Sequence, residues 1–197
     1  MAVGHNAGVN VTTGVRNTLI GGLAGDSLTT GSNNVAIGMG SLQTEDGHGR
    51  NVAIGAQALS LLNAGTDAYN VAIGYDAGKQ VSAGTQNTLI GGLVGDALTT
   101  GGRNVAIGYL ALSSETGSDR SVAIGTDALK NQNAGSGFAY NTAVGDSAGE
   151  EITTGTLNTI IGGLAGDALT TGERNVALGY ATLSNEDTGS RSTAVGS

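Results

Sequence analysis

The sequence predicts an all-β chain that folds as a parallel β-solenoid, and three observations support this. One short phrase, Asn-Val-Ala-Ile-Gly or a close variant, recurs through all 197 residues. The copies are evenly spaced, and each places β-branched residues next to a glycine. A short fixed period is typical of repeat proteins, whose units bury their apolar side only against neighbouring units. We therefore expect about eleven turns of about 17 residues, forming a single domain over residues 1–197.

Positions within a unit are counted from the Asn of each phrase, which is position zero. Successive phrases are 17 residues apart in most units, as from Asn34 to Asn51. Two units are longer, with 19 and 20 residues, and both end in Ala-Tyr, at Tyr69 and Tyr140. We interpret them as one type of unit that carries an extended loop.

A second, longer period groups the 17-residue units. The phrase Gly-Gly-Leu-(Ala/Val)-Gly-Asp begins at Gly21, Gly91 and Gly162, so its starts differ by 70 and 71 residues. Four units therefore make one super-repeat, and the Gly-Gly-Leu unit is called the second of the four. The super-repeats are 1–69, 70–140 and 141–197. Because the chain starts and stops inside a repeat, we expect it to be a fragment of a longer fibrous protein.

The first strand of each unit is expected over positions one to three. Val at position one and Ile at position three share one face of an extended segment, and Ala at position two lies on the other face. β-Branched residues favour a strand, and the Gly at position four allows a tight corner. We expect Val and Ile to face the interior and to form a buried isoleucine column. Its members are Ile37, Ile54, Ile73, Ile107 and Ile124.

The second half of each unit is expected to form another short strand and a second glycine corner. Position eight is Gly in the first and second units and Leu in the third and fourth. Position eleven is aliphatic where position eight is Gly, as at Leu28 after Gly25, and acidic in the third units. This exchange of volume is what a close-packed interior requires. The Asn residues at position zero are expected to form a structural ladder of stacked amides.

The opposite face of the first strand is also apolar, which predicts a homotrimer. Position two is Ala in most units and a larger residue in the second units, and a continuous apolar stripe usually marks an interface. We expect the stripe to face two symmetry mates around a three-fold axis. The expected trimer-interface residues are Leu19, Ala36, Ala53, Ala72, Leu89, Ala106, Ala123, Ile160 and Ala177. A monomer with a tolerated alanine-rich surface is the alternative.

The phrase Asn-Val-Ala-Ile-Gly, followed by a small residue and then Thr-Gly or Ala-Gly, resembles the repeats of YadA-like trimeric autotransporter adhesin heads. That resemblance implies a left-handed parallel β-roll that trimerises along the strand of the phrase. The segment from Asn104 to Leu112 is also similar to repeats of bacteriophage tail fibres and large bacterial surface proteins. Adhesin-head units are slightly shorter, so this chain lies nearer to the tail-fibre and surface-repeat variants. The resemblance implies an extracellular module, on a cell surface or a virion.

Composition argues against nucleic-acid, membrane and enzymatic functions. The net charge is −8 and the only lysines are Lys79 and Lys130, whereas nucleic-acid binding depends on clustered cations. No apolar run approaches the length of a membrane span. The chain has no cysteine, and its only histidines, His5 and His48, belong to no catalytic set with a believable spacing. We expect neither catalysis nor a cofactor.

The expected function is a structural or adhesive fibre module that supports or forms a host-surface receptor-binding surface. The extended loops place Tyr69, Phe138 and Tyr140 on one unit type, and exposed loop aromatics are common recognition groups. These three residues are the expected contacts for a host-surface glycan or protein. A purely structural role of the tyrosines at a turn edge is the alternative.

Two further patterns leave alternatives open. The Gly-Gly-Leu-Ala-Gly-Asp phrase places Asp26, Asp96 and Asp167 where a cation could bind, although such residues more often bond their own backbone in turns. Paired threonines, as at Thr29 and Thr30, suggest an ice-binding solenoid. Acidic residues interrupt that array, so we hold ice binding, or a scaffold role in an extracellular filament, as the alternative functions.

Overall fold

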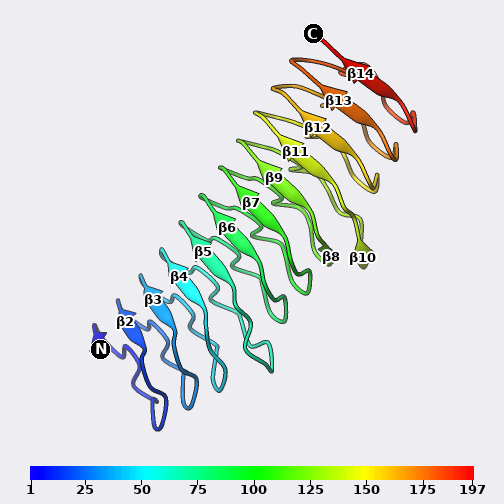
Figure 1. Cartoon of the computed structure of the whole chain (residues 1–197). Coiled ribbons are helices and arrows are strands. Elements are labelled where there is room, and N and C mark those ends of the chain that lie inside the picture. The colour runs from blue at the N-terminus through cyan, green and yellow to red at the C-terminus, as the bar shows by residue number, and fades with distance from the viewer.

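The computed structural model describes residues 1–197 and shows a rod of about 11 stacked turns of about 17 residues, with no helix (Figure 1). The all-β parallel solenoid predicted from the repeat is therefore confirmed. The strands are β1 (Ala2–Val3), β2 (Thr18–Ile20), β3 (Val35–Ile37), β4 (Val52–Ile54), β5 (Val71–Ile73), β6 (Thr88–Ile90), β7 (Val105–Ile107), β8 (Ser118–Asp119), β9 (Val122–Ile124), β10 (Gly137–Phe138), β11 (Thr142–Val144), β12 (Thr159–Ile161), β13 (Val176–Leu178) and β14 (Thr193–Val195).

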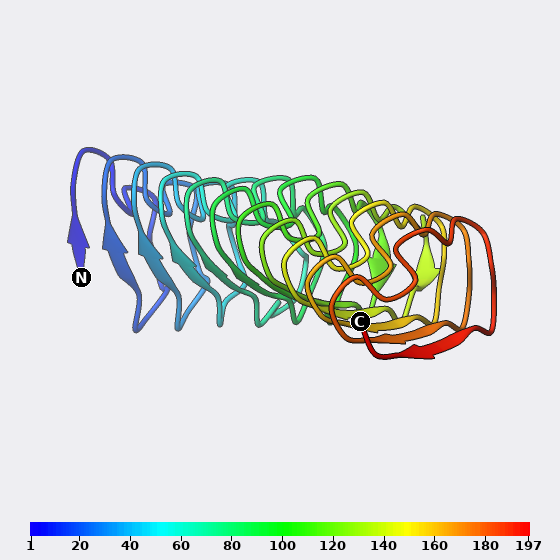
Figure 2. The same cartoon turned by 90° about the horizontal axis from the view of Figure 1, so that it is seen from above.

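The strands of the repeated phrase form one 12-stranded parallel sheet, and β8 and β10 form a separate two-stranded sheet. Equivalent positions pair directly, so that Ala36 lies opposite Ala53 and Leu89 lies opposite Ala106. Figure 2 shows the strands along one side of every turn, with the turn-and-loop segments completing the coil. The strands stay in register across the two longer units as well, since Val52 pairs with Val71 and Val122 with Thr142, so the extra residues of these units lie in their loops.

The expected second strand is absent from the ordinary turn, because the backbone there is left-handed at positions six and eight. Leu110 and Leu112, for example, have φ values of +57° and +56°. The segment is still bonded to its neighbours, since the N–H of Leu112 donates to the Ala128 carbonyl in the next turn at 3.0 Å. The second half of each unit is thus a stack of identical turns rather than a strand, and bonding between coils continues through it.

The sequence assignment of the two strand faces is wrong, and the inner face belongs to position two. Ala36, Ala53, Ala72, Ala106, Ala123, Ala177, Leu19, Leu89 and Ile160 are all 0–2% exposed within the single chain. Val and Ile of the same strands lie outward and are only half-buried in most turns. The expected trimer-interface residues therefore form the core, and the expected buried isoleucine column lies on the surface.

Volume explains why position two is the inner one. Leu89 fills space left by the glycines at position eight of its own unit and the preceding unit. A Cβ built on Gly78 would lie 2.7 Å from a Leu89 methyl carbon, and one built on Gly95 would lie 3.1 Å from the other. Leu19 relates in the same way to Gly8 and Gly25. Where position two is Ala, the third and fourth units supply a buried Leu at position eight instead, as at Leu112 and Leu129.

The glycine corner at position four is confirmed. Gly108 has φ +140°, which side chains rarely adopt, and a Cβ there would lie 2.3 Å from the Gly125 carbonyl oxygen. The same contact recurs between neighbouring turns along the rod. Glycine at this position lets successive corners stack at the spacing that the sheet requires.

The Asn ladder exists, but its hydrogen bonds join side chains to the main chain rather than amide to amide. The Asn70 side-chain oxygen accepts the main-chain N–H of Asn87 at 2.9 Å, and the Asn87 amide donates to the Gly101 carbonyl at 2.9 Å. Each Asn thus ties one turn to the next, and all of them except Asn51, whose amide donates to Gly49 of the preceding turn, also close their own turn. All of this takes place in the buried interior, which supports a structural role for these residues.

Candidate interaction surface

The most extended functional feature is the outward face of the 12-stranded sheet, which we call the outer apolar face. It consists of positions one and three of each phrase, and all of them are Val, Ile, Leu or Thr. In the middle of the rod these side chains are half-buried by their neighbours, and towards the end of the chain Ile161 and Leu178 are 38% and 43% exposed. The face runs the length of the rod and carries no charge.

Position five, directly after the corner glycine, carries a large apolar side chain in four turns and His, Gly, Ala, Thr, Asp or Ser in the others. Met39, Tyr75, Tyr109 and Tyr180 are all more than half exposed. The Tyr109 ring lies over Gly92 of the preceding turn, because a Cβ on Gly92 would be 3.5 Å from the ring. Tyr180 lies over Gly163 in the same way, and at both places a methyl group in place of the glycine hydrogen would make an ordinary contact with the ring.

The extended loops form the two Arg–aromatic clusters, which comprise Arg50, Asp67 and Tyr69 in the first super-repeat and Arg120, Phe138 and Tyr140 in the second. In the second cluster the Arg120 guanidinium carbon lies 4.2 Å from the Phe138 ring centroid and 5.4 Å from that of Tyr140. Arg120 also donates a hydrogen bond to the Tyr140 hydroxyl. Phe138 and Tyr140 lie with their ring centroids 5.5 Å apart.

The first cluster is built around an ion pair. Arg50 lies 3.0 Å from the Asp67 carboxylate and 5.3 Å from the Tyr69 ring centroid. The hydrogen bond to the Tyr69 hydroxyl, together with the Asp67 charge, raises the pKa of Arg50 above its ordinary value. The three aromatic residues named from the sequence are thus exposed on the loops, each beside an arginine that the sequence reasoning did not single out. Every arginine of the chain stands one residue before position zero, and the available signal was that Arg50 and Arg120 directly precede the two long units.

The paired threonines are used within the fold. The Thr29 hydroxyl donates to the Asp46 carbonyl at 2.9 Å, and the Thr99 hydroxyl donates to the Thr116 carbonyl at 2.8 Å. Each of these bonds links one turn to the next. The first threonine of such a pair therefore contributes to stacking, which reduces the hydroxyl groups free to order external water.

The aspartates of the Gly-Gly-Leu-Ala-Gly-Asp phrase are partly desolvated. Asp26 and Asp167 each leave one buried carboxylate oxygen without a hydrogen-bond partner. Burial raises the pKa of Asp96, and the Asp76 charge adds to this, while N–H groups of Asp96 and Ala97 and the Lys79 charge oppose it. None of these aspartates belongs to a group of three metal-ligating side chains.

Buried polar side chains inside the coil form a network in the second super-repeat. Glu115 is fully buried, and its carboxylate accepts five hydrogen bonds, three from main-chain N–H groups of its own loop. Gln132 donates to Glu115 at 3.0 Å and to the Ser121 hydroxyl at 2.9 Å, and accepts from Asn141 at 2.8 Å. Ser121 stands at position zero, where most units have Asn, and the Gln132 side chain supplies the amide group that is missing there.

His48 and Glu45 occupy the matching place in the first super-repeat, and His5, the other histidine, is exposed near the start of the chain. Burial raises the pKa of Glu45, while the His48 N–H and imidazole oppose this shift.

No helix in the structure could cross a bilayer. Comparison of the chain with protein-family models, with curated proteins and with solved structures gave no match.

Proposed function

We propose that the chain is a structural module of an extracellular fibre that assembles as a homotrimer through its outer apolar face. The supporting observation is the continuous, uncharged surface of Val, Ile and Thr along the rod. Large exposed apolar patches on soluble proteins usually mark interaction sites. The phage tail fibre and the bacterial surface adhesin are the two settings that the repeat phrase suggests.

The dimensions of the face suit assembly of copies of this chain. Twelve strands spaced about 4.8 Å apart give a length on the order of 55 Å, and three residues of about 3.3 Å give a width of about 10 Å. The area of the outer apolar face is therefore roughly 550 Å² before the position-five tyrosines are added. A standard interface buries about 800 Å² per partner. Because the surface repeats turn by turn, identical rods can pack alongside one another in register. In a closed ring, every copy buries its outer apolar face.

Light scattering tests the assembly. The native chain should have three times the mass of the 19.2 kDa monomer at micromolar concentration. Ile107→Lys places a charge in the middle of the outer apolar face, and we expect a folded monomer. Ala83→Lys adds the same charge at an exposed position outside this face and should stay trimeric. A monomeric native chain, or a trimer that Ile107→Lys leaves intact, would contradict the proposal.

We propose that the Arg–aromatic clusters supply the receptor contact. Each presents an exposed aromatic face beside a guanidinium group, an arrangement that can stack on a sugar ring and donate hydrogen bonds to it. Replacement of Tyr69, Phe138 and Tyr140 by Ala should abolish binding to a glycan panel that the native chain recognises. Tyr109→Ala is the matched control, since this tyrosine is equally exposed but lies beside the outer apolar face.

Ice binding and a scaffold role in an extracellular filament remain the alternative functions. Thermal hysteresis of the native chain that Thr13→Lys abolishes would favour ice binding, because Thr13 is an exposed member of the paired array. Binding of the threonine hydroxyls to carbonyls of the next turn argues for the fibre module instead.

A further inference from the structure

Equivalent positions of the first and second super-repeats hold two buried carboxylates in very different surroundings. Glu115 and Glu45 both lie at position eleven of a third unit, and both are fully buried. Every lone-pair direction of Glu115 is used by its loop N–H groups, by Gln132 and by Ala134. Glu115 therefore shows what a fully satisfied carboxylate looks like at this place in the fold.

Glu45 lacks most of these partners. One of its oxygens, Oε1, accepts the His48 main-chain N–H at 3.0 Å, and the other, Oε2, is buried without a hydrogen-bond partner. Leu62 stands at the position of Gln132, so no side-chain amide is supplied from the next turn. The Ala64 N–H is near enough to lower the pKa of Glu45, but it completes no hydrogen bond to Oε2. A buried anion in this condition needs a cation or a proton.

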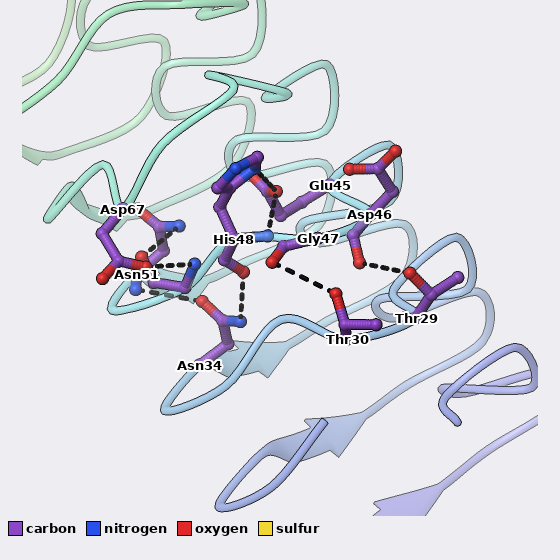
Figure 3. A network of polar contacts seen from close by, with 10 residues as sticks. Thr29, Thr30, Asn34, Glu45, Asp46, Gly47, His48, Asn51 and Asp67 are labelled. Carbon is purple, nitrogen blue, oxygen red and sulfur yellow. Dashed lines mark hydrogen bonds and ion pairs between the residues drawn. The ribbon is translucent and has the colours of Figure 1, made fainter. Parts of the chain in front are cut away.

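The residue that differs beside it is a histidine. His48 stands where the second super-repeat has Ser118, and Figure 3 shows the Glu45 and His48 side chains turned towards each other. Nδ1 of His48 is 3.5 Å from Glu45 Oε1, and it is also buried without a hydrogen-bond partner. The backbone here is held in place, because the His48 carbonyl accepts the Asn34 amide at 3.2 Å.

A third ligand is available at the surface side. Asp46 is exposed, and one ligand atom from each of Glu45, Asp46 and His48 lies within 4.8 Å of the others, the only such group in the chain. Two ligands held about 2.0–2.1 Å from a tetrahedral ion are about 3.3 Å apart, close to the separation of Nδ1 and Oε1. The Asp46 carbonyl accepts the Thr29 hydroxyl at 2.9 Å, which holds the main chain of Asp46 in place and leaves its carboxylate free of that bond.

We propose that Glu45, Asp46 and His48 bind one divalent transition-metal ion of the zinc type. An imidazole nitrogen with two carboxylates suits zinc and its neighbours, whereas calcium and magnesium take oxygen ligands in larger number. The ion would neutralise Glu45 and link the surface loop 44–49 to the interior of the coil. The site shares no ligand with the outer apolar face or with the Arg–aromatic clusters, although the Gly49 N–H of its loop donates to the Asp67 carboxylate of the first cluster at 3.0 Å.

Titration of the metal-free chain with Zn²⁺ tests the site by calorimetry, and titration with Co²⁺ tests it by visible absorption. We expect one ion per chain and the absorption of a four-coordinate Co²⁺ centre. His48→Ser copies the residue of the second super-repeat, so it should fold, and it should weaken binding by at least about tenfold. His5→Asn removes the exposed histidine and should leave the affinity unchanged. Ca²⁺ should give no comparable binding.

A measurement on the native chain keeps the test independent of variant folding. Zn²⁺ should shift the side-chain nitrogen resonances of His48 in the NMR spectrum and leave those of His5 in place. The proposal is overturned if the native chain takes up no stoichiometric Zn²⁺, if His48→Ser binds as tightly as the native chain, or if His5 responds in place of His48.

Discussion

At the scale of single residues, exchange of volume between positions two and eight decides the inside of this fold. Leu89 is fully buried between the glycines of two turns, whereas Ile107 on the neighbouring strand lies on the outer apolar face. Both are large aliphatic residues on β-strands, so residue type alone does not distinguish their surroundings.

Leu89→Ala should lower the free energy of unfolding by about 2–5 kcal/mol, because the glycines at position eight cannot fill the cavity. Ile107→Ala should cost no more than about 1 kcal/mol in the monomeric state, since the side chain is only half-buried there. Urea denaturation of both variants, each in an Ile54→Lys background that places a charge on the outer apolar face and keeps the chain monomeric, measures the difference. Equal losses would show that the faces of the strand are wrongly assigned.

Asp96 should make stability depend on pH. Burial, with the Asp76 charge, raises its pKa in the native state above the ordinary value of 3.8. As pH rises past 3.8, the unfolded chain releases this proton first, so the free energy of unfolding falls until pH exceeds the raised native-state pKa. Asp96→Asn should remove that part of the pH dependence and be the more stable form at pH 7. Denaturation at a series of pH values checks this, and an unchanged profile would contradict it.

At the scale of the structural element, the corner at position four sets how closely turns stack. Gly108 needs a left-handed backbone and also leaves no room for a side chain against Gly125. Gly92, in contrast, has an ordinary backbone conformation, and a Cβ there would meet the Tyr109 ring at 3.5 Å, an ordinary contact. Of these two glycines in neighbouring turns, only Gly108 thus occupies a place that excludes every other residue.

Gly108→Ala should destabilise the rod by about 3 kcal/mol or more, from backbone strain and steric overlap together. Gly92→Ala is the control and should change the free energy of unfolding by less than about 1 kcal/mol. Chemical denaturation measures both, and circular dichroism reports whether the strand signal survives. A tolerated Gly108→Ala would mean that corners can separate without loss of the sheet.

At the scale of the whole molecule, the structural period is four turns rather than one. Leu89 belongs to a second unit and fits only beside the glycines of the first and second units, while third units rely on Leu112 and its equivalents. Stability in such a stack is close to a sum of unit and nearest-neighbour terms. The order of the units therefore matters as much as their number.

Deletion of residues 70–140 removes one super-repeat and recreates a native junction, so the shortened rod should keep its stability per turn. Deletion of residues 87–120 removes two units and takes Leu89 away from Gly78, which leaves a cavity at the new junction. We expect this second rod to be less stable than the first despite having more turns. Urea denaturation of the two deletions decides this, and a stability that simply follows length would contradict it.

The fold was predictable from the sequence because the spacing of one repeated phrase indicates the length of a turn, the glycine corners and the positions of the loops. The inward face was not, because a three-residue strand with Val and Ile on one side and Ala on the other is apolar on both. The deciding signal lies in position two taken together with position eight, because Leu19 occurs where Gly8 and Gly25 leave space. Because Ala36 and its equivalents are buried in the core, the proposed homotrimer interface lies on the Val and Ile columns of the outer apolar face.

The polar site was harder to predict than the fold. Glu45 and His48 are close in sequence, but the missing partner of Glu45 follows from Leu62, which lies in the next turn. Only the stacked structure shows that this leucine replaces an amide. The aromatic loop residues were found correctly as exposed groups, while their arginine neighbours emerged from the geometry.

The parallel ladder also has a mechanical consequence. Its hydrogen bonds run along the rod, so a pull on the two ends would load one coil junction at a time, as in opening a zipper, and would not shear many bonds at once. Each coil of about 17 residues that peels away would release about 60 Å of extended chain. A single rod should therefore lengthen in small, regular steps under modest tension and absorb work gradually. Packing of rods side by side would make the assembly stiffer than a single rod, because neighbouring rods would have to open their coil junctions together.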